Sequence, residues 1–114
     1  MHELGIVFYV IDAVKKAVEE NKATKVTKVT LEVGEVSAVV PSYFKECYSW
    51  AIKKEETMKD STLDLIVVEA ISFCNNCQST YSTTKYGKTC PHCKSSNTYL
   101  ITGRDVIIKN IEVE

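Results

Sequence analysis

Four cysteines arranged in two C-x-x-C pairs constrain this chain more than any other feature. Cys74 pairs with Cys77, Cys90 pairs with Cys93, and twelve residues separate the two pairs. A C-x-x-C turn directs two thiolates toward one point, so two such turns supply the four sulfurs of a tetrahedral metal site with bonds of about 2.3 Å. The intervening residues are enough for a hairpin that returns the second pair to the first. The sequence therefore predicts a metal centre built from these four cysteines.

The segment that carries the cysteines lacks the residues of a hydrophobic core. Residues 74–98 include no Val, Ile, Leu, Met or Phe, and Tyr81 and Tyr86 are the large apolar groups. So little buried surface does not offset chain entropy, whereas structural zinc stabilises comparable small modules by about 10–16 kcal/mol. Four thiolates close the coordination sphere, so we predict structural rather than catalytic zinc. Iron held by four thiolates uses the same ligands and stays an alternative.

The cysteines are expected to be reduced, because the chain is typical of a cytoplasmic protein. Its start has no basic region, Glu3 and Asp12 interrupt the first apolar stretch, and no apolar run approaches the roughly 20 residues that span a bilayer. In the cytosol, paired cysteines suggest a metal before a disulfide. Neither pair opens a helix after a strand, as a thioredoxin-like redox pair does. We expect no association with membranes.

Hydrophobic periodicity predicts two helices and three strands around the cysteine segment. Apolar residues recur at steps of three and four over 4–21, and Pro41 suits the first turn of a second helix over 41–55. Strands are predicted over 25–37, with Gly34 marking its end or a bulge, over 61–73 and over 104–114. The residues expected to be buried are Leu4, Val7, Ile11, Val14 and Val18 on the first helix, Val29, Leu31 and Val33 on the first strand, and Tyr43, Phe44, Cys47, Trp50 and Ala51 on the second helix.

These elements predict an α+β fold in two layers, with two helices on a small mixed three-stranded sheet and an inserted zinc-ribbon subdomain. We place the helix-and-sheet domain at residues 1–71 plus 105–114 and the inserted four-cysteine domain at 72–104. Cys47, on the apolar face of the second helix, is interpreted as a small buried hydrophobe. His92 lies between two cysteine ligands and is expected to point outward.

The first three residues, Met1, His2 and Glu3, offer a second set of metal donors. A free Met1 amine, the His2 backbone nitrogen and the His2 imidazole can close two fused chelate rings, with a fourth donor from the Glu3 backbone or from elsewhere. Planar nitrogen-rich sets favour Ni(II) or Cu(II) over tetrahedral zinc. The alternative is that these residues simply begin the first helix, with Glu3 complementing the positive end of its dipole. The triplet alone does not decide between the two.

The charge pattern leaves two classes of function open. The net charge of −1 gives no global field to attract nucleic acid or an anionic membrane. Residues 74–104 nevertheless include four basic residues and no acidic one, which suits a nucleic acid or an acidic protein surface. A zinc-ribbon nucleic-acid-binding or adaptor protein is therefore the alternative to a metal carrier. An enzyme is disfavoured, because His2 and His92 are the only histidines and no acid, base and nucleophile come together.

Taken in order, these motifs resemble one family over the whole chain, the HypA hydrogenase-maturation nickel chaperones. The matching stretches are MHE at the start, LEVGEVSAVVP after the first helix, the two C-x-x-C pairs with CPHC, and GRDVIIKNIEVE at the end. The resemblance implies a nickel metallochaperone without enzymatic activity. It implies His2 as the side-chain nickel ligand, Met1 and Glu3 as candidate backbone donors, and Cys74, Cys77, Cys90 and Cys93 as zinc ligands.

The resemblance also implies particular partners. It implies cooperation with the GTPase HypB and delivery of nickel to the [NiFe]-hydrogenase large-subunit precursor. Some members of the family also assist urease maturation, so urease maturation proteins are a further candidate class of partner. Nucleic acid is not expected as a partner under this interpretation.

Overall fold

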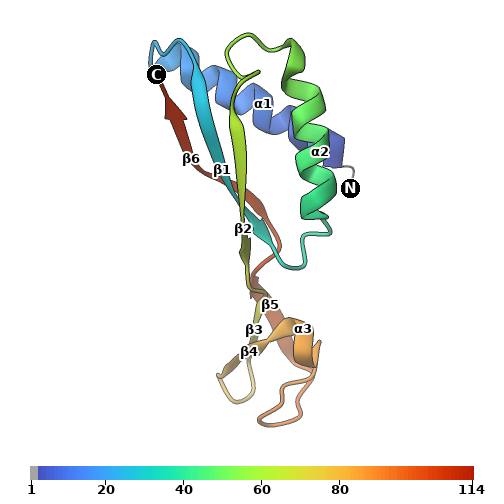
Figure 1. Ribbon diagram of the computed structural model, residues 1–114. Coiled ribbons are helices and arrows are strands. Elements are labelled where there is room, and N and C mark those ends of the chain that lie inside the picture. Colours follow the sequence, from blue (N-terminus) through green and yellow to red (C-terminus); the bar gives the residue numbers. More distant parts are fainter. Residues whose placement is uncertain (1–2) are drawn as a thin grey trace. The chain divides into compact units, whose positions relative to one another are not determined.

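The computed structural model describes residues 3–114, which fold into an α+β architecture (Figure 1). The helices are α1 (Glu3–Glu20), α2 (Pro41–Ala51), which continues into the 3-10 turn η1 (Ile52–Lys54), and the short α3 (Thr83–Tyr86). The strands are β1 (Val26–Gly34), β2 (Thr62–Val68), β3 (Ile71–Cys74), β4 (Thr80–Ser82), β5 (Thr98–Thr102) and β6 (Val106–Val113). They form two three-stranded sheets, in the orders β2-β1-β6 and β4-β3-β5. The predicted fold class is confirmed, with one sheet more than expected.

The described chain divides into two compact units. The first comprises the described residues up to Glu32, together with Val39–Ile66 and Ile107–Glu114. The second comprises Val33–Ala38 and Val67–Val106. The first unit therefore contains both long helices, and the second contains the sheet β4-β3-β5, α3 and the four paired cysteines. Across residues 3–114, no helix combines the length and the apolar character that crossing a membrane requires.

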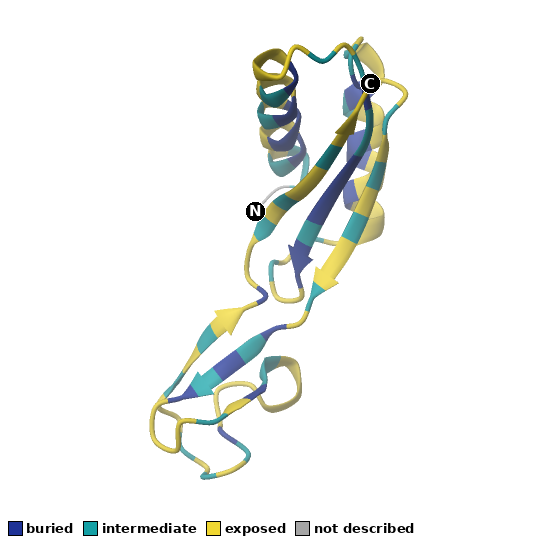
Figure 2. Cartoon of the chain, turned by 90° about the vertical axis from the view of Figure 1, so that its left-hand side faces the viewer, coloured by how far each residue is buried: buried dark blue, intermediate teal, exposed yellow. Residues whose placement is uncertain are grey.

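In the first unit, α1 and α2 contact each other and lie on one side of the sheet β2-β1-β6 (Figure 1). The central strand β1 is the most buried, whereas its two neighbours carry many exposed residues (Figure 2). Val29, Leu31 and Val33 are buried, as their alternation predicts. β1 ends at Gly34, where the sequence predicted an end or a bulge.

The helix α1 closely follows its prediction, beginning at Glu3 rather than residue 4 and ending at Glu20 rather than residue 21. The predicted stripe is buried along most of its length, and Val10 joins it, whereas Leu4 is only half-buried. Residues at steps of three and four share one face of a helix, so this stripe covers the sheet while the charged residues stay in water.

The predicted core of α2 was partly wrong. Tyr43 and Trp50 were expected to be buried but are 51% and 62% exposed, and Ala51 is half-buried. Residues 43 and 50 lie one step around the helix from the stripe that faces the core, so the apolar face is wider than the buried one. The residues of α2 and η1 that are buried are Phe44, Cys47, Tyr48 and Ile52. The expected burial of Cys47 is confirmed.

The single strand predicted over 61–73 is also wrong, because the chain breaks there into two strands of different sheets. β2 ends at Val68 and β3 begins at Ile71. Between them Ala70 is fully buried, with its N–H donating to the Glu35 carboxylate at 2.9 Å and its carbonyl accepting from the Thr83 N–H at 3.0 Å. These bonds replace the partners that a continuous strand would give Ala70.

Two glycines permit a close approach of backbones within the second unit. A Cβ on Gly34 would lie 2.1 Å from the Gly103 carbonyl oxygen, and a Cβ on Gly103 would lie 2.5 Å from the Cα of Ala70. Gly103 also has φ of +96°, a conformation that other residues rarely adopt. These contacts hold the end of β5 beside the start of β3, which are paired strands. The glycines therefore help to position the sheet that carries the first pair of cysteines.

Candidate metal centre

Each C-x-x-C pair forms a tight turn of the same kind. The Gln78 N–H donates to the Cys74 carbonyl at 2.8 Å, and the Lys94 N–H donates to the Cys90 carbonyl at 2.9 Å. Gln78 and Lys94 both adopt positive φ, at 59° and 67°. Matching hydrogen bonds and backbone conformations at matching positions show that the two turns present their thiols in the same way.

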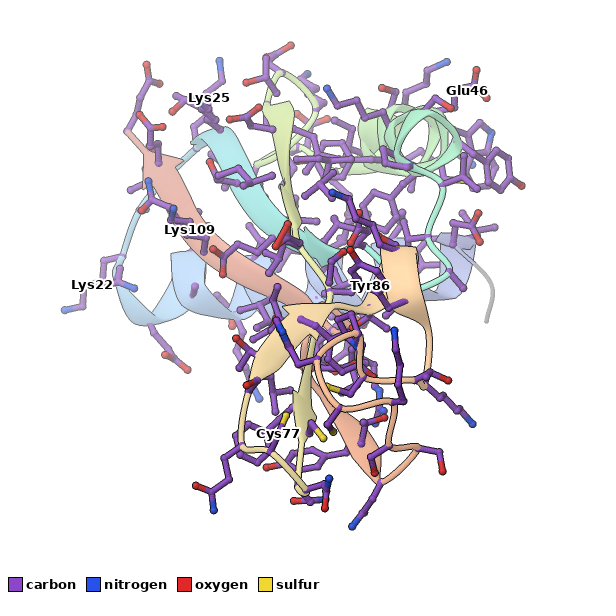
Figure 3. All side chains as sticks on the ribbon, turned by 90° about the horizontal axis from the view of Figure 1, so that it is seen from below. Lys22, Lys25, Glu46, Cys77, Tyr86 and Lys109 are labelled. Atoms are coloured by element: carbon purple, nitrogen blue, oxygen red, sulfur yellow. The ribbon has the colours of Figure 1, made fainter. Side chains whose placement is uncertain are left out.

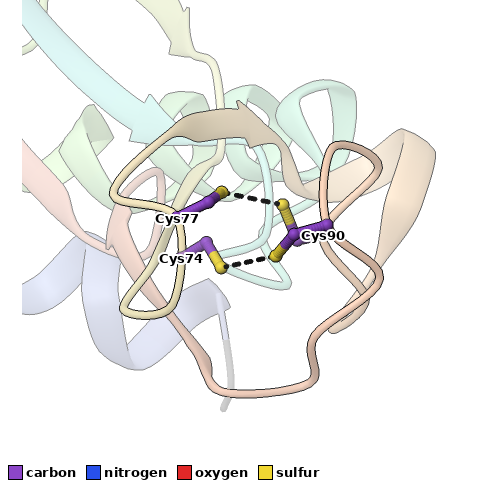
Figure 4. Close-up of side chains that lie close together, drawn as sticks. Cys74, Cys77 and Cys90 are labelled. Atoms are coloured by element: carbon purple, nitrogen blue, oxygen red, sulfur yellow. Dashed lines mark hydrogen bonds between the residues drawn. The ribbon is translucent and has the colours of Figure 1, made fainter.

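The structure brings the four predicted thiols together (Figure 4). All four Sγ atoms lie within 4.8 Å of one another. The contacts between the turns are 3.5 Å from Cys74 Sγ to Cys93 Sγ and 3.6 Å from Cys77 Sγ to Cys90 Sγ. Sulfurs bound to one tetrahedral zinc at about 2.3 Å are separated by about 3.8 Å. The cysteines are free rather than disulfide-bonded, so their arrangement fits a zinc ion.

The thiols differ in their access to solvent. Cys74 and Cys90 are fully buried and form a small cluster with Tyr81, against which Cys93 packs half-buried. Cys77 is exposed, and the sulfur atoms gather around it in Figure 3. The cysteines therefore provide much of this buried cluster, in agreement with a segment that lacks aliphatic residues.

Hydrogen bonds lower the pKa of the two more accessible thiols. The Asn76 side chain donates to Cys93 Sγ at 3.4 Å, and together with the Ser95 backbone N–H it lowers the pKa of Cys93 to about 6. The Ser79 hydroxyl and then its backbone N–H lower the pKa of Cys77, because donors stabilise a thiolate. At neutral pH these two sulfurs are therefore the readier ligands for a cation.

The pKa of the buried Cys74 thiol moves the other way. A hydrogen bond from the Cys77 backbone N–H lowers this pKa, but burial and the neighbouring Cys93 and Cys77 thiols outweigh it and raise the pKa to about 11. A divalent cation bound here would displace that proton, since coordinated thiols are deprotonated. The site is thus suited to a cation whose charge compensates several thiolates.

The sequence prediction missed the scaffold that holds these turns. β3 pairs antiparallel with β4 and β5, with Ser72 opposite Tyr81 and Cys74 opposite Thr98. The available signal was the Thr- and Tyr-rich composition around β4 and β5, since both residue types favour strands. It also missed Asn76 and Ser79, whose polar side chains beside the cysteines were the only indication of their contacts with sulfur.

The second predicted site lies largely outside the described residues, which exclude Met1 and His2. Glu3 is the first residue of α1 and is half-buried. A shallow hollow of about 260 Å³ lies beside this end of α1, lined by Leu4, Tyr43, Glu46, Cys47 and Trp50. Among residues 3–114, the four-cysteine cluster is the one group of three or more such side chains placed to hold a metal. His92 is exposed, as expected.

The electrostatics near Glu3 come from α2. A hydrogen bond with the Cys47 thiol raises the pKa of Tyr43, and the carboxylates of Glu3 and Glu46 add to the rise. The start of α1 therefore lies near two carboxylates and a neutral phenol, surroundings that favour a cation over an anion.

Comparisons with known proteins agree over the full chain. The family described as "Hydrogenase/urease nickel incorporation, metallochaperone, hypA" matches residues 1–113. The hydrogenase maturation factor HypA of Chlorobium phaeobacteroides is 35% identical over 114 residues, covering 100% of both chains. That of Prosthecochloris aestuarii is 31% identical with the same coverage. The solution structure of the Ni metallochaperone HypA from Helicobacter pylori shares the fold, with a TM-score of 0.76, 24% identity, and 99% and 97% of the two chains covered.

Proposed function

Because the chain belongs to the HypA family of hydrogenase and urease nickel-incorporation metallochaperones, we propose that it binds Ni(II) at Met1, His2 and Glu3. The His2 imidazole is the side-chain ligand, and backbone nitrogens of Met1 and Glu3 complete the set. The chain delivers this ion to the [NiFe]-hydrogenase large-subunit precursor. The observation that carries the proposal is the family match over residues 1–113. As a member of a metallochaperone family, the chain is not an enzyme.

The chemistry of the terminus suits a cargo that must be released. A nitrogen-rich set favours nickel over zinc, and few side-chain ligands make a site from which the ion can leave. Glu3 begins α1 and Glu46 lines the adjacent hollow, so carboxylates offset the positive end of the helix dipole. Nickel is thus held by groups distinct from the four thiols.

We further propose that Cys74, Cys77, Cys90 and Cys93 hold structural zinc. Four thiolates leave no open position, so zinc here stabilises the inserted domain of residues 72–104 without taking part in transfer. Residues 1–71 plus 105–114 then form the nickel-binding domain. The sulfur contacts of 3.5 Å and 3.6 Å between the two turns support this assignment.

The proposed partners follow from the family. The GTPase HypB cooperates in nickel insertion, the hydrogenase precursor receives the ion, and urease maturation proteins are a second class of recipient pathway. The setting is the cytoplasm, where the thiols stay reduced.

Nickel titration by calorimetry tests the cargo site. Three forms are compared with the unmodified chain: His2→Ala, a chain extended by one residue before Met1, and His92→Ala as the control for the other histidine. We expect severe loss of nickel binding in the first two and none in the control, with zinc content unchanged throughout. Full nickel affinity in His2→Ala would refute the site, and full affinity in the extended chain would remove the Met1 amine from it.

A further inference from the structure

The side chain of Asn76 connects the two cysteine turns. Asn76 belongs to the first turn, and its Nδ2 donates to Sγ of Cys93, the last ligand position of the second turn, at 3.4 Å. The adjacent Asn75 has a different role, because its Nδ2 donates to Asn97 Oδ1 at 3.2 Å and its backbone N–H donates to the Asn97 carbonyl at 3.0 Å. Of these two neighbouring asparagines, Asn76 is therefore the one whose side chain bonds to a sulfur.

The sulfur that Asn76 contacts lies on the accessible side of the centre. Cys74 and Cys90 are fully buried, whereas Cys93 is half-buried and Cys77 is exposed. A competing metal or chelator reaches the accessible sulfurs first, so exchange of a bound ion begins there. A donor that fixes Cys93 acts on one of the ligands most open to exchange.

We propose that Asn76 is a positioning residue of the metal centre, which holds Cys93 from the opposite turn and so keeps the four sulfurs tetrahedral and selective for zinc over nickel. This inference rests on the structural zinc proposed above. A tetrahedral set keeps all sulfur pairs equally far apart, and the contacts of 3.5 Å and 3.6 Å between the turns are consistent with it.

Nickel makes a different geometric demand. Ni(II) favours square-planar or tetragonal sets, in which two pairs of ligands lie on opposite sides of the metal. To flatten the four sulfurs, one turn must rotate against the other, and this rotation breaks the bond from Asn76 to Cys93. The bond therefore opposes the geometry that nickel favours more than the one that zinc favours. In a chain whose proposed cargo is nickel, such a restraint keeps the cargo out of the thiolate site.

The test compares substitutions at two adjacent residues of the full-length, zinc-loaded chain. Asn76→Ala removes the donor, and Asn76→Asp removes it while keeping the side-chain shape. Asn75→Ala and Asn75→Asp are the matched controls, which make the same changes one residue away. Two quantities are measured: the rate of zinc transfer to a chromophoric chelator, and the thiolate-to-nickel charge-transfer absorption that develops with excess Ni(II). That absorption reports sulfur ligands and so does not detect nickel bound by nitrogen at the terminus.

We expect both Asn76 variants to lose zinc roughly tenfold faster than the wild-type chain, as is typical when a partner of a ligand is removed. They should also develop stronger nickel–thiolate absorption, while both Asn75 variants behave as wild type. Cobalt substitution should give weaker tetrahedral ligand-field bands in the Asn76 variants. Equal zinc-loss rates and equal nickel–thiolate absorption at the two positions would overturn the inference. A wild-type chain that holds no zinc would instead refute the structural zinc itself.

Discussion

The hydroxyl of Tyr48 lies 2.6 Å from the hydroxyl of Ser61 and connects α2 to the residue that precedes β2. Ser61 Oγ donates to the Met58 carbonyl at 2.6 Å, so its own proton is used and the Tyr48 hydroxyl is the donor between them. Tyr48 is also one of the largest fully buried side chains of the chain. This bond therefore satisfies the polar end of a core residue in the first unit.

Replacing Tyr48 with Phe should lower the free energy of unfolding of the first unit by about 1 kcal/mol at neutral pH, because one buried hydrogen bond is lost while the ring remains. Urea unfolding followed by helical circular dichroism measures this change, since both long helices belong to that unit. Tyr43→Phe is the control, because Tyr43 is exposed. Equal stability of the two variants would contradict a contribution from the Ser61 bond.

The same tyrosine predicts a dependence of stability on alkaline pH. Burial raises the pKa of Tyr48, and the hydrogen bond with Ser61 only partly opposes this rise. A raised folded-state pKa means that stability is fully present below the ordinary tyrosine pKa of about 10 and is lost as pH rises through the folded-state value. The stability advantage of the wild-type chain over Tyr48→Phe should therefore shrink above about pH 10. An advantage that stays constant up to pH 11 would show that Tyr48 does not contribute.

Replacing Cys90 with Ser should abolish zinc binding and unfold the second unit while leaving the first unit largely folded. Cys90 is fully buried among the sulfurs, and structural zinc supplies stabilisation that the polar segment lacks. Metal analysis gives the zinc content, and amide hydrogen exchange shows which unit has lost protection. Cys47→Ser is the control, since this buried cysteine belongs to the first unit and should leave one zinc per chain. Full zinc content in Cys90→Ser would rule out four-thiolate coordination.

Two glycine substitutions should have opposite effects. Gly103→Ala places a Cβ 2.5 Å from the Cα of Ala70 at a positive φ, so it should destabilise the second unit by at least about 1–3 kcal/mol. Gly5→Ala in α1 meets no atom within 4 Å and should stabilise the first unit by about 0.5–1 kcal/mol. Hydrogen exchange resolves the two effects by unit. A neutral Gly103→Ala would show that the backbones there move apart at little cost.

The parts of the fold that the sequence predicted well are those in which burial follows a local period. The stripe of α1 is the clearest case, because the spacing of its valines alone determines which face is apolar. Tyr43 and Trp50 were misassigned, because composition does not show how wide the buried face of a helix is. The break at Ala70 depends on Glu35 and Thr83, which are distant in sequence, so no local pattern could reveal it.

The candidate site shows the same division. The spacing of the cysteines predicted that their sulfurs converge, because a C-x-x-C turn has few conformations. The contact from Asn76 to Cys93 was not predictable, since it depends on how one turn faces the other. The expectation for His2 and Met1 rests on the family resemblance and remains a prediction, because both lie outside the described residues.

The exposure of Trp50 has a practical consequence. It is the single tryptophan of the chain, it is 62% exposed, and it lines the same hollow as Leu4 at the beginning of α1. The indole is therefore an intrinsic fluorophore at the end of the molecule where the cargo ion is proposed to bind. Emission from this one side chain can follow events at that end in real time, without a label and without interference from a second tryptophan.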